Sequence, residues 1–179
     1  MPSFTDTILI AAPVDRVWHA LTDPEASRLW RGAEFVTDWQ TGSPLLVRRS
    51  FGIKTIEDHG RVVLAVPPAV GASAEARVSR GTDGTERKEG ARLTLSILPS
   101  ISHLSDRPEN YSTIDMVLAA QGADTSLTVT HTVPEPPAHR EKAAASGLDM
   151  SGEKHVAFYW RSTLPLLRDL IEGLSLIHI

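Results

Sequence analysis

Hydrophobic and polar residues alternate along most of the chain, and helical spacing replaces this alternation in three places. The alternating segments predict strands over 3–11, 34–39, 45–51, 56–66, 93–97, 111–118 and 126–133. In the last of these, Leu127, Val129, His131 and Val133 share one face, and threonines occupy the other. Such alternation is typical of an antiparallel sheet with one buried and one hydrated face.

Two short helices are predicted directly after the first strand. Pro13 stands where the first begins, since its missing N–H is one that a first helical turn does not need. Pro24 follows an aspartate at the start of the second, and Gly32 ends it. A third, long helix is predicted over 152–174. Its hydrophobic stripe recurs every three or four residues and comprises Val156, Trp160, Leu164, Leu167, Ile171 and Leu174.

Three segments depart from these patterns. Residues 58–60, Asp-His-Gly, interrupt a strand and predict a bulge or a turn. Residues 71–90 are rich in charge, and we interpret them as an insertion that is peripheral to function, with a hairpin closed at 81–84. Residues 175–179 follow a polar helix end and resemble a translated read-through, so they are either a native end or an added tail.

The order of these elements predicts an α+β fold, with one domain over 1–174. A curved antiparallel sheet of about six to seven strands has an apolar face that must be covered, and the last helix is long enough to lie across it. Because a curved sheet cannot touch a straight helix along its whole length, we expect a ligand cavity between them.

The composition of the chain excludes several classes of chemistry and of partner. The chain has no cysteine, which excludes disulfides, thiolate nucleophiles and cysteine-bound metals. A net charge of −4 gives no reason to expect nucleic acid as a partner. The sequence predicts no secretory signal and no membrane span, so a cytoplasmic location is expected. No phosphate-binding loop, Ser-His-Asp order or metal-ligand spacing stands out, so we expect no metal and no cofactor.

Several strings resemble a known superfamily. Residues 11–24, Ala-Ala-Pro-Val-Asp-Arg-Val-Trp-His-Ala-Leu-Thr-Asp-Pro, resemble the start of START-like (SRPBCC) domains. Segments 35–45, 59–63, 106–113, 126–131 and 160–172 are similar to the branch related to the activator of the heat-shock-protein-90 ATPase. The resemblance implies the helix-grip fold. It leaves function open, because the superfamily includes ligand carriers and polyketide cyclases.

Two titratable residues are candidates for the predicted pocket. Alternation places His131 on the apolar face, where an imidazole can act as an acid, a base or a hydrogen-bond partner of a ligand; alternatively, it is a core histidine paired with the protein. Arg49 shares a face with Val47 and Phe51. It either points inward, where it can bind a carboxylate, or lies on the surface of an edge strand.

Larger apolar side chains are candidates to line the same pocket. An aromatic or acyl ligand would contact rings and flexible side chains, although these residue types also fill ordinary cores. The candidates are Trp39, Met116, Tyr159, Trp160 and Leu164.

These observations favour a protein that binds an apolar or aromatic small molecule. Two alternatives remain open at this stage. One is a cyclase-like or dehydratase-like enzyme on the same scaffold, in which His131 transfers protons. The other is a module that binds a chaperone or another protein, or forms a homodimer.

Overall fold

The structure is a computed structural model that describes residues 3–69, 78–80, 86–100, 104–134 and 153–173. Within these ranges, antiparallel strands form one sheet in the order β1-β8-β7-β6-β4-β3-β2, and β5 pairs with β6 outside this path. The strands are β1 (Ser3–Ile10), β2 (Glu34–Val36), β3 (Pro44–Phe51), β4 (Lys54–Val66), β5 (Val78–Arg80), β6 (Glu86–Leu98), β7 (Ser112–Gln121) and β8 (Asp124–Thr132).

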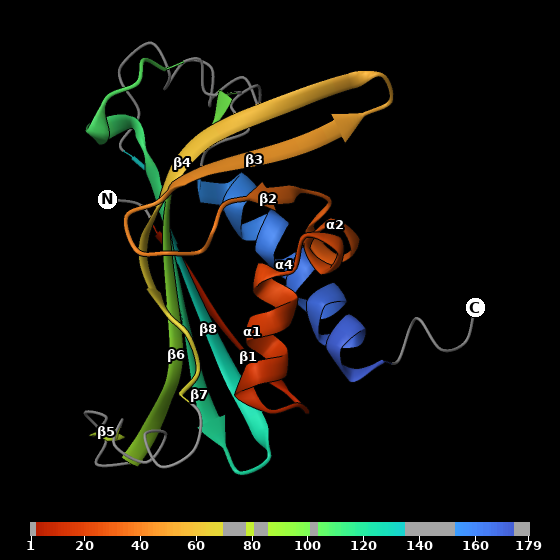
Figure 1. Cartoon of the computed structure of the whole chain (residues 1–179), viewed down its shortest axis with the longest axis vertical. Coiled ribbons are helices and arrows are strands. Elements are labelled where there is room, and N and C mark those ends of the chain that lie inside the picture. The colour runs from red at the N-terminus through yellow and green to blue at the C-terminus, as the bar shows by residue number, and fades with distance from the viewer. Residues whose placement is uncertain (1–2, 70–77, 81–85, 101–103, 135–152, 174–179) are drawn as a thin grey trace.

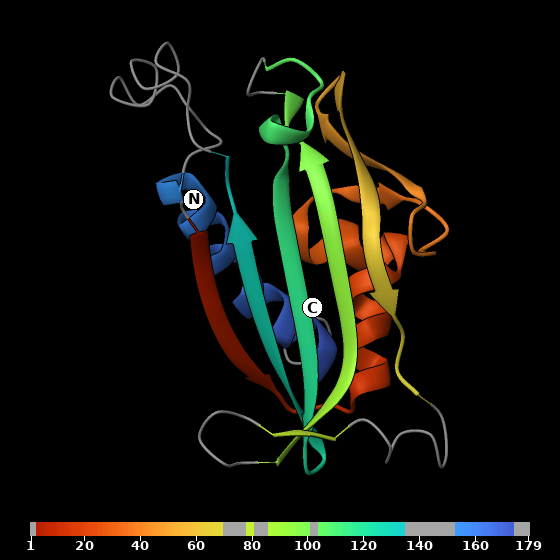
Figure 2. The same ribbon diagram turned by 90° about the vertical axis from the view of Figure 1, so that its left-hand side faces the viewer.

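The three α-helices of the described residues lie on one side of this sheet. They are α1 (Val14–Thr22), α2 (Pro24–Arg31) and α4 (Glu153–Glu172), and Pro108–Asn110 form a short 3-10 helix. Figure 1 shows the helices beside the long strands, and Figure 2, turned by 90°, shows them behind the curved sheet. The predicted helix-grip α+β fold is confirmed.

Local signals place the helix ends as predicted. Asp23 accepts a 2.9 Å hydrogen bond from the backbone N–H of Ala26 and thereby caps α2. Gly32 ends α2 in the left-handed conformation, with φ of 67°. The C-terminal end of α4 is bound to α1, because Arg16 Nη2 donates a 2.8 Å hydrogen bond to the backbone oxygen of Ile171.

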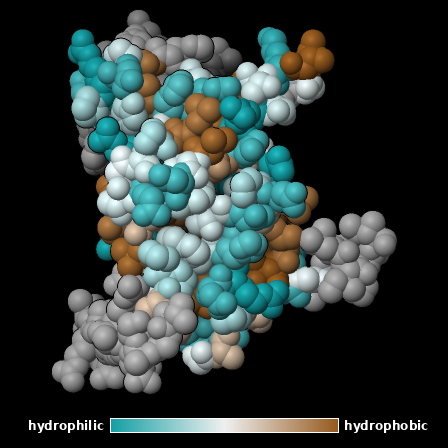
Figure 3. Space-filling model, in the orientation of Figure 1, coloured by the Kyte–Doolittle hydropathy of each residue, from teal (hydrophilic) through white to brown (hydrophobic). Residues whose placement is uncertain are grey.

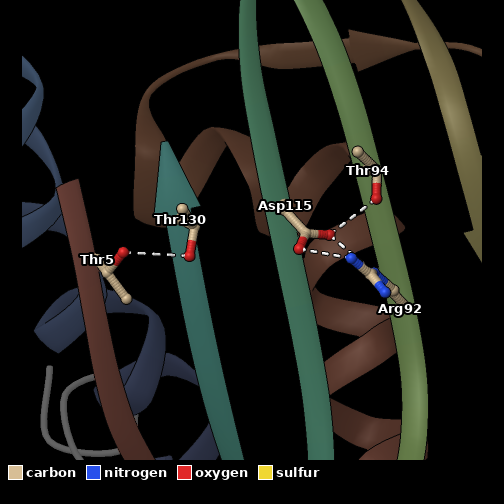
Figure 4. Close-up of polar contacts among 5 residues, drawn as sticks. All are labelled: Thr5, Arg92, Thr94, Asp115 and Thr130. Atoms are coloured by element: carbon tan, nitrogen blue, oxygen red, sulfur yellow. Dashed lines mark hydrogen bonds and ion pairs between the residues drawn. The ribbon is translucent and has the colours of Figure 1, made fainter. Parts of the chain in front are cut away.

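The outer face of the sheet is polar. Thr5 and Thr130 face one another across β1 and β8 with their hydroxyl oxygens 3.3 Å apart (Figure 4). On the neighbouring strands Asp115 accepts hydrogen bonds from Thr94, at 2.8 Å, and from two nitrogens of Arg92, at 3.0 and 2.9 Å. This hydrated surface lies opposite the helices, as the alternation predicted.

The inner face and the helices enclose one hydrophobic core. Its members alternate along the strands and follow the predicted stripe of α4, where Val156, Trp160, Leu164, Leu167 and Ile171 are all buried. One polar residue shares the inner face at the border of the sheet: Asp6 lies between Phe4 and Ile8 on that side and pairs in register with Val129. Leu174 lies outside the described residues.

Three predicted elements differ from the structure. The strand predicted over 34–39 ends at Val36, and Trp39, beyond this end, has a left-handed backbone conformation. Residues 58–60 form neither a bulge nor a turn; they continue β4, whose irregularity lies between Val62 and Leu64. The strand predicted over 93–97 is the end of β6, which begins at Glu86, inside the proposed insertion.

The other part of that insertion is only partly described. β5 pairs antiparallel with the first residues of β6, as expected for strands joined by a hairpin. The turn predicted at 81–84 and the tail at 175–179 lie outside the described residues.

Candidate functional site

His131 lies at the end of β8, on the inner face of the sheet, and contacts α4. Nε1 of Trp160 donates a 2.9 Å hydrogen bond to Nδ1 of His131, and the two rings meet edge to face. Burial, with the charge of Arg31 as a second cause, lowers the pKa of His131 to about 4. The ring is therefore neutral at pH 7. Because Nδ1 accepts a hydrogen bond, its proton is on Nε2, which can donate.

A buried arginine ends α2 beside this pair. Arg31 is only 8% exposed, and its guanidinium carbon lies 3.9 Å from the ring centroid of Phe35 and 4.9 Å from that of Trp30. Its Nε donates a 3.1 Å hydrogen bond to the hydroxyl of Tyr159 on α4. No carboxylate of the described residues forms an ion pair with it. The guanidinium is therefore held by aromatic faces and one hydroxyl.

Trp39 extends this group of rings toward the surface. It stacks on Phe35 with ring centroids 6.2 Å apart and an interplanar angle of 26°. Its φ is 58°, a left-handed conformation that bulky residues rarely adopt. Such strain costs on the order of 1–3 kcal/mol and persists only where surrounding contacts impose it. The indole is thus held in a fixed position at the end of β2.

Arg49 lies on the inner face of β3 beside a buried carboxylate. Its Nη2 is 3.8 Å from Oδ2 of Asp58, and the two side chains are 37% and 4% exposed. Asp58 also accepts a 2.8 Å hydrogen bond from the backbone N–H of Ser100. Burial is the main cause that lowers the pKa of Arg31, and the positive charge of Arg49 lowers it further. The two arginines are therefore close enough to interact.

We call seven of these side chains the aromatic–arginine cluster: they are Trp30, Arg31, Phe35, Trp39, His131, Tyr159 and Trp160. Successive members touch, from His131 through Trp160 and Tyr159 to Arg31 and Phe35. The cluster joins α2, β2, β8 and α4. Its members Trp39, His131 and Tyr159 are partly exposed, whereas Trp30, Phe35 and Trp160 are buried.

The structure divides the residues predicted from the sequence into two groups. Trp39, Tyr159, Trp160 and His131 belong to the cluster, and Arg49 lies close to it. Met116 and Leu164 are each 1% exposed and pack within the hydrophobic core. Nothing in their surroundings distinguishes them from other core side chains, so their ligand-binding role stays a prediction.

A separate groove lies among the three helices. It has a volume of about 620 Å³ and is bordered by α1, α2 and the end of α4. Its lining combines charged residues, including Asp15, Asp23 and Glu25, with Leu29, Leu170 and Ile171. Figure 3 views the molecule from the side of Figure 1 and shows hydrophobic areas interspersed with hydrophilic ones over the helices. This groove is not the predicted space between the sheet and α4.

Three further findings concern only the described part of the chain. No group of three histidine or acidic side chains is arranged to hold a metal ion there. Asp58 is buried while its neighbours Glu57 and His59 are exposed, as expected for adjacent residues of a strand. No helix of that part is long and apolar enough to cross a membrane.

Sequence reasoning missed Arg31 and Phe35. A basic residue at the end of a helix usually interacts with the helix dipole in water, so Arg31 looks like a surface residue. The signal that would have found it is spacing: Ser27, Trp30 and Arg31 share the buried face of α2 at positions i, i+3 and i+4.

The comparison with protein families adds an independent finding. The model of the family described as Activator of Hsp90 ATPase homolog 1-like protein matches residues 11–172. The chain belongs to this family. The resemblance seen in the sequence is thereby confirmed. No curated protein gives a significant match to the chain.

Solved structures of this fold come from several organisms. ChR145 from Cytophaga hutchinsonii is 22% identical, with a TM-score of 0.62 and coverage of 96% of this chain and 94% of that one. CalU16 from Micromonospora echinospora is 21% identical, with a TM-score of 0.56 and coverage of 96% and 74%. An HSP90 activator from Plasmodium falciparum, PFC0360w, is 15% identical, with a TM-score of 0.57 and coverage of 97% of each chain. At these identities the likeness shows the fold alone.

Proposed function

We propose that this member of the Activator of Hsp90 ATPase homolog 1-like family binds an apolar or aromatic small molecule between the sheet and α4, and does not act on it chemically. The observation that carries the proposal is the aromatic–arginine cluster. It gathers aromatic rings from α2, β2 and α4 at one junction, and Trp39, Tyr159 and His131 remain partly exposed there. Rings that are fixed and only partly covered are suited to contact an apolar ligand.

The strained backbone of Trp39 supports the same proposal. A left-handed tryptophan is disfavoured unless its position matters or its contacts impose it, and such residues concentrate at ligand clamps. Trp39 stacks on Phe35, which also contacts Arg31. A ligand that entered beside Trp39 would therefore meet the other rings of the cluster.

The state of His131 argues against the enzymatic alternative. A general base is most effective when its pKa lies near the working pH, whereas the pKa of His131 is about 4. As an acid it would be almost wholly deprotonated at pH 7, and as a base it would bind a proton weakly. Its Nδ1 is also occupied by Trp160. A neutral donor from Nε2 fits the binding of a ligand better than proton transfer.

Binding can be tested with the neutral fluorescent probe N-phenyl-1-naphthylamine. We expect saturable binding that is weakened about tenfold or more by Trp39→Ala and by Tyr159→Ala, because each removes ring contacts worth roughly 1–3 kcal/mol. Phe158→Ala is the matched control, since Phe158 precedes Tyr159 on α4 but is 68% exposed. The absence of saturable binding, or equal losses in all three variants, would show that the proposal is wrong.

A second candidate function, the binding of another protein, is favoured by the groove among α1, α2 and α4. Leu29 borders this groove and is 63% exposed, and one solved structure of the fold is described as an HSP90 activator. Exposed apolar residues beside a groove are typical of interaction surfaces. Leu29→Asp should abolish a stoichiometric complex with a partner protein without changing the binding of the fluorescent probe. A complex that survives this change would show that the groove is not the protein-binding surface.

A further inference from the structure

The guanidinium of Arg31 has more hydrogen-bond donors than the described protein uses. An arginine side chain carries five N–H groups in one plane. Nε–H is bound to Tyr159, and no residue of the described ranges accepts from Nη1 or Nη2. A buried charge without a carboxylate is costly unless another group satisfies it. Nη1 and Nη2 are not fully buried, so an acceptor from solution can reach these two unused donors.

The surroundings of Arg31 favour an acceptor with negative charge. Burial lowers the pKa of Arg31, and the positive charge of Arg49 lowers it further. Asp58 is a buried carboxylate in this region, but it is occupied by Arg49 and by the backbone N–H of Ser100. His131 contributes a neutral ring with a donor at Nε2. Because Arg49 and Asp58 offset one another, the charge that the described residues leave uncompensated in this region is that of Arg31.

The aromatic neighbours decide from which direction an acceptor can approach. Phe35 lies 3.9 Å from the guanidinium carbon, and Trp30 lies 4.9 Å away, so ring contacts cover the guanidinium. The N–H groups point outward in its plane, where a carboxylate or sulfonate can accept two parallel hydrogen bonds. The same rings would contact the hydrocarbon part of a molecule that carries the acid.

We propose that Arg31 is the recognition residue for the acidic group of an aromatic or apolar organic anion. The terminal nitrogens of Arg31 bind two oxygens of the acid, and the rest of the ligand lies against the aromatic–arginine cluster. This inference rests on the proposed function and names the chemical class of its ligand. The inference concerns the charge of the ligand. It can therefore be wrong even if the protein binds neutral apolar ligands as the proposed function states.

Two probes with the same carbon skeleton distinguish the proposed function from the inference about Arg31. 8-Anilinonaphthalene-1-sulfonate differs from N-phenyl-1-naphthylamine by one sulfonate group, and both fluoresce in apolar sites. Fluorescence titrations at pH 7 and about 0.15 M salt limit contributions from surface charge. We expect the wild-type protein to bind the sulfonate about tenfold or more tightly, the gain typical of a charge-assisted pair.

Variants of two arginines test which residue causes the tighter binding of the sulfonate probe. Arg31→Gln should remove this preference, so that the ratio of the two probes' dissociation constants falls to about one. Arg28→Gln is the matched control, because Arg28 is on the same helix but half exposed and beside Glu34. If Arg31→Gln does not melt cooperatively, Arg31→Lys should retain part of the preference, since an ammonium keeps the charge but loses the two-point contact.

Competition in the wild-type protein gives a readout that needs no variant. 1-Naphthoate should displace the bound sulfonate probe at a concentration about tenfold lower than 1-naphthamide does. Equal binding of the two fluorescent probes, equal displacement by the two competitors, or a preference that survives Arg31→Gln would overturn the inference while the proposed function stands. If neither fluorescent probe binds saturably, the proposed function is wrong as well.

Discussion

Trp160 of α4 donates a hydrogen bond to His131 of β8, whose imidazole is neutral at pH 7 because burial lowers its pKa to about 4. The contact joins the last helix to the sheet at one end of the aromatic–arginine cluster. It also fixes which ring nitrogen of His131 carries the proton. The consequences for stability can be measured without knowledge of the ligand.

Acidification should destabilise the protein through His131. Its pKa is about 4 in the folded protein against 6.5 for an ordinary histidine, so the unfolded chain binds a proton first as the pH falls. The stabilisation is complete above pH 6.5 and is lost as the pH falls toward 4. Its size is on the order of 3 kcal/mol. Urea denaturation of wild type and His131→Gln across this range should give a smaller pH dependence for the variant, and titration near 6.5 by NMR would contradict the prediction.

Replacing His131 tests the hydrogen bond itself. His131→Leu leaves the buried indole N–H of Trp160 without an acceptor, which should cost about 1–3 kcal/mol of unfolding free energy at pH 7. His131→Gln retains a carbonyl oxygen that can accept, so its cost should be smaller. The two midpoints of urea denaturation would coincide if the indole N–H contributed nothing.

Gly60→Ala should be strongly destabilising. Gly60 lies in β4 opposite Ile97, and a Cβ atom there would overlap the backbone oxygen of Ser96. Because backbone cannot move aside cheaply, we expect a loss of about 1–3 kcal/mol or more. Gly90→Ala is the comparison, since its Cβ would meet side-chain atoms of Val14 and should cost less. Thermal melts that rank the two variants in the opposite order would contradict the register of β4 and β6.

Truncations on α4 test how closely this helix packs. Leu164 is 1% exposed and Leu166 is 51% exposed on the same helix. Leu164→Ala should therefore lower the free energy of unfolding by about 2–5 kcal/mol, whereas Leu166→Ala should change it by less than about 0.5 kcal/mol. A mild effect of Leu164→Ala would instead indicate that its side chain borders an open cavity.

The fold could be predicted from the sequence because its signals are local and periodic. Alternation located β1, β3, β7 and β8 within one to three residues at each end, and Pro24 with Gly32 marked both ends of α2. The errors fell where tertiary contacts decide the conformation. β2 ends at Val36, and Trp39 beyond it stacks on Phe35 in a left-handed conformation that the alternation does not indicate. The glycine at position 60 predicts an interruption of the strand, whereas Gly60 continues β4 and lies where β6 approaches too closely for a Cβ atom.

The candidate site was only partly predictable. His131 could be placed on the inner face by alternation, and Tyr159 with Trp160 by helical spacing, but their contacts depend on how α4 lies across the sheet. The position of Arg31 before Gly32 predicts a hydrated side chain, and only its helical spacing with Ser27 and Trp30 indicates burial. Its burial results from the meeting of α2 with Phe35 and Tyr159, which are distant from one another in the sequence.

The position of Asp6 has a consequence for self-association. β1 is the outermost strand at one border of the described sheet, and such borders can recruit a strand from another molecule. A strand of a second chain added there would extend the apolar face of the sheet past Asp6. The carboxylate of Asp6 would then be removed from water. An ionised group that faces inward at a border discourages such additions. Copies of this protein should therefore not join edge to edge through β1, and any pairing of copies would have to use another surface.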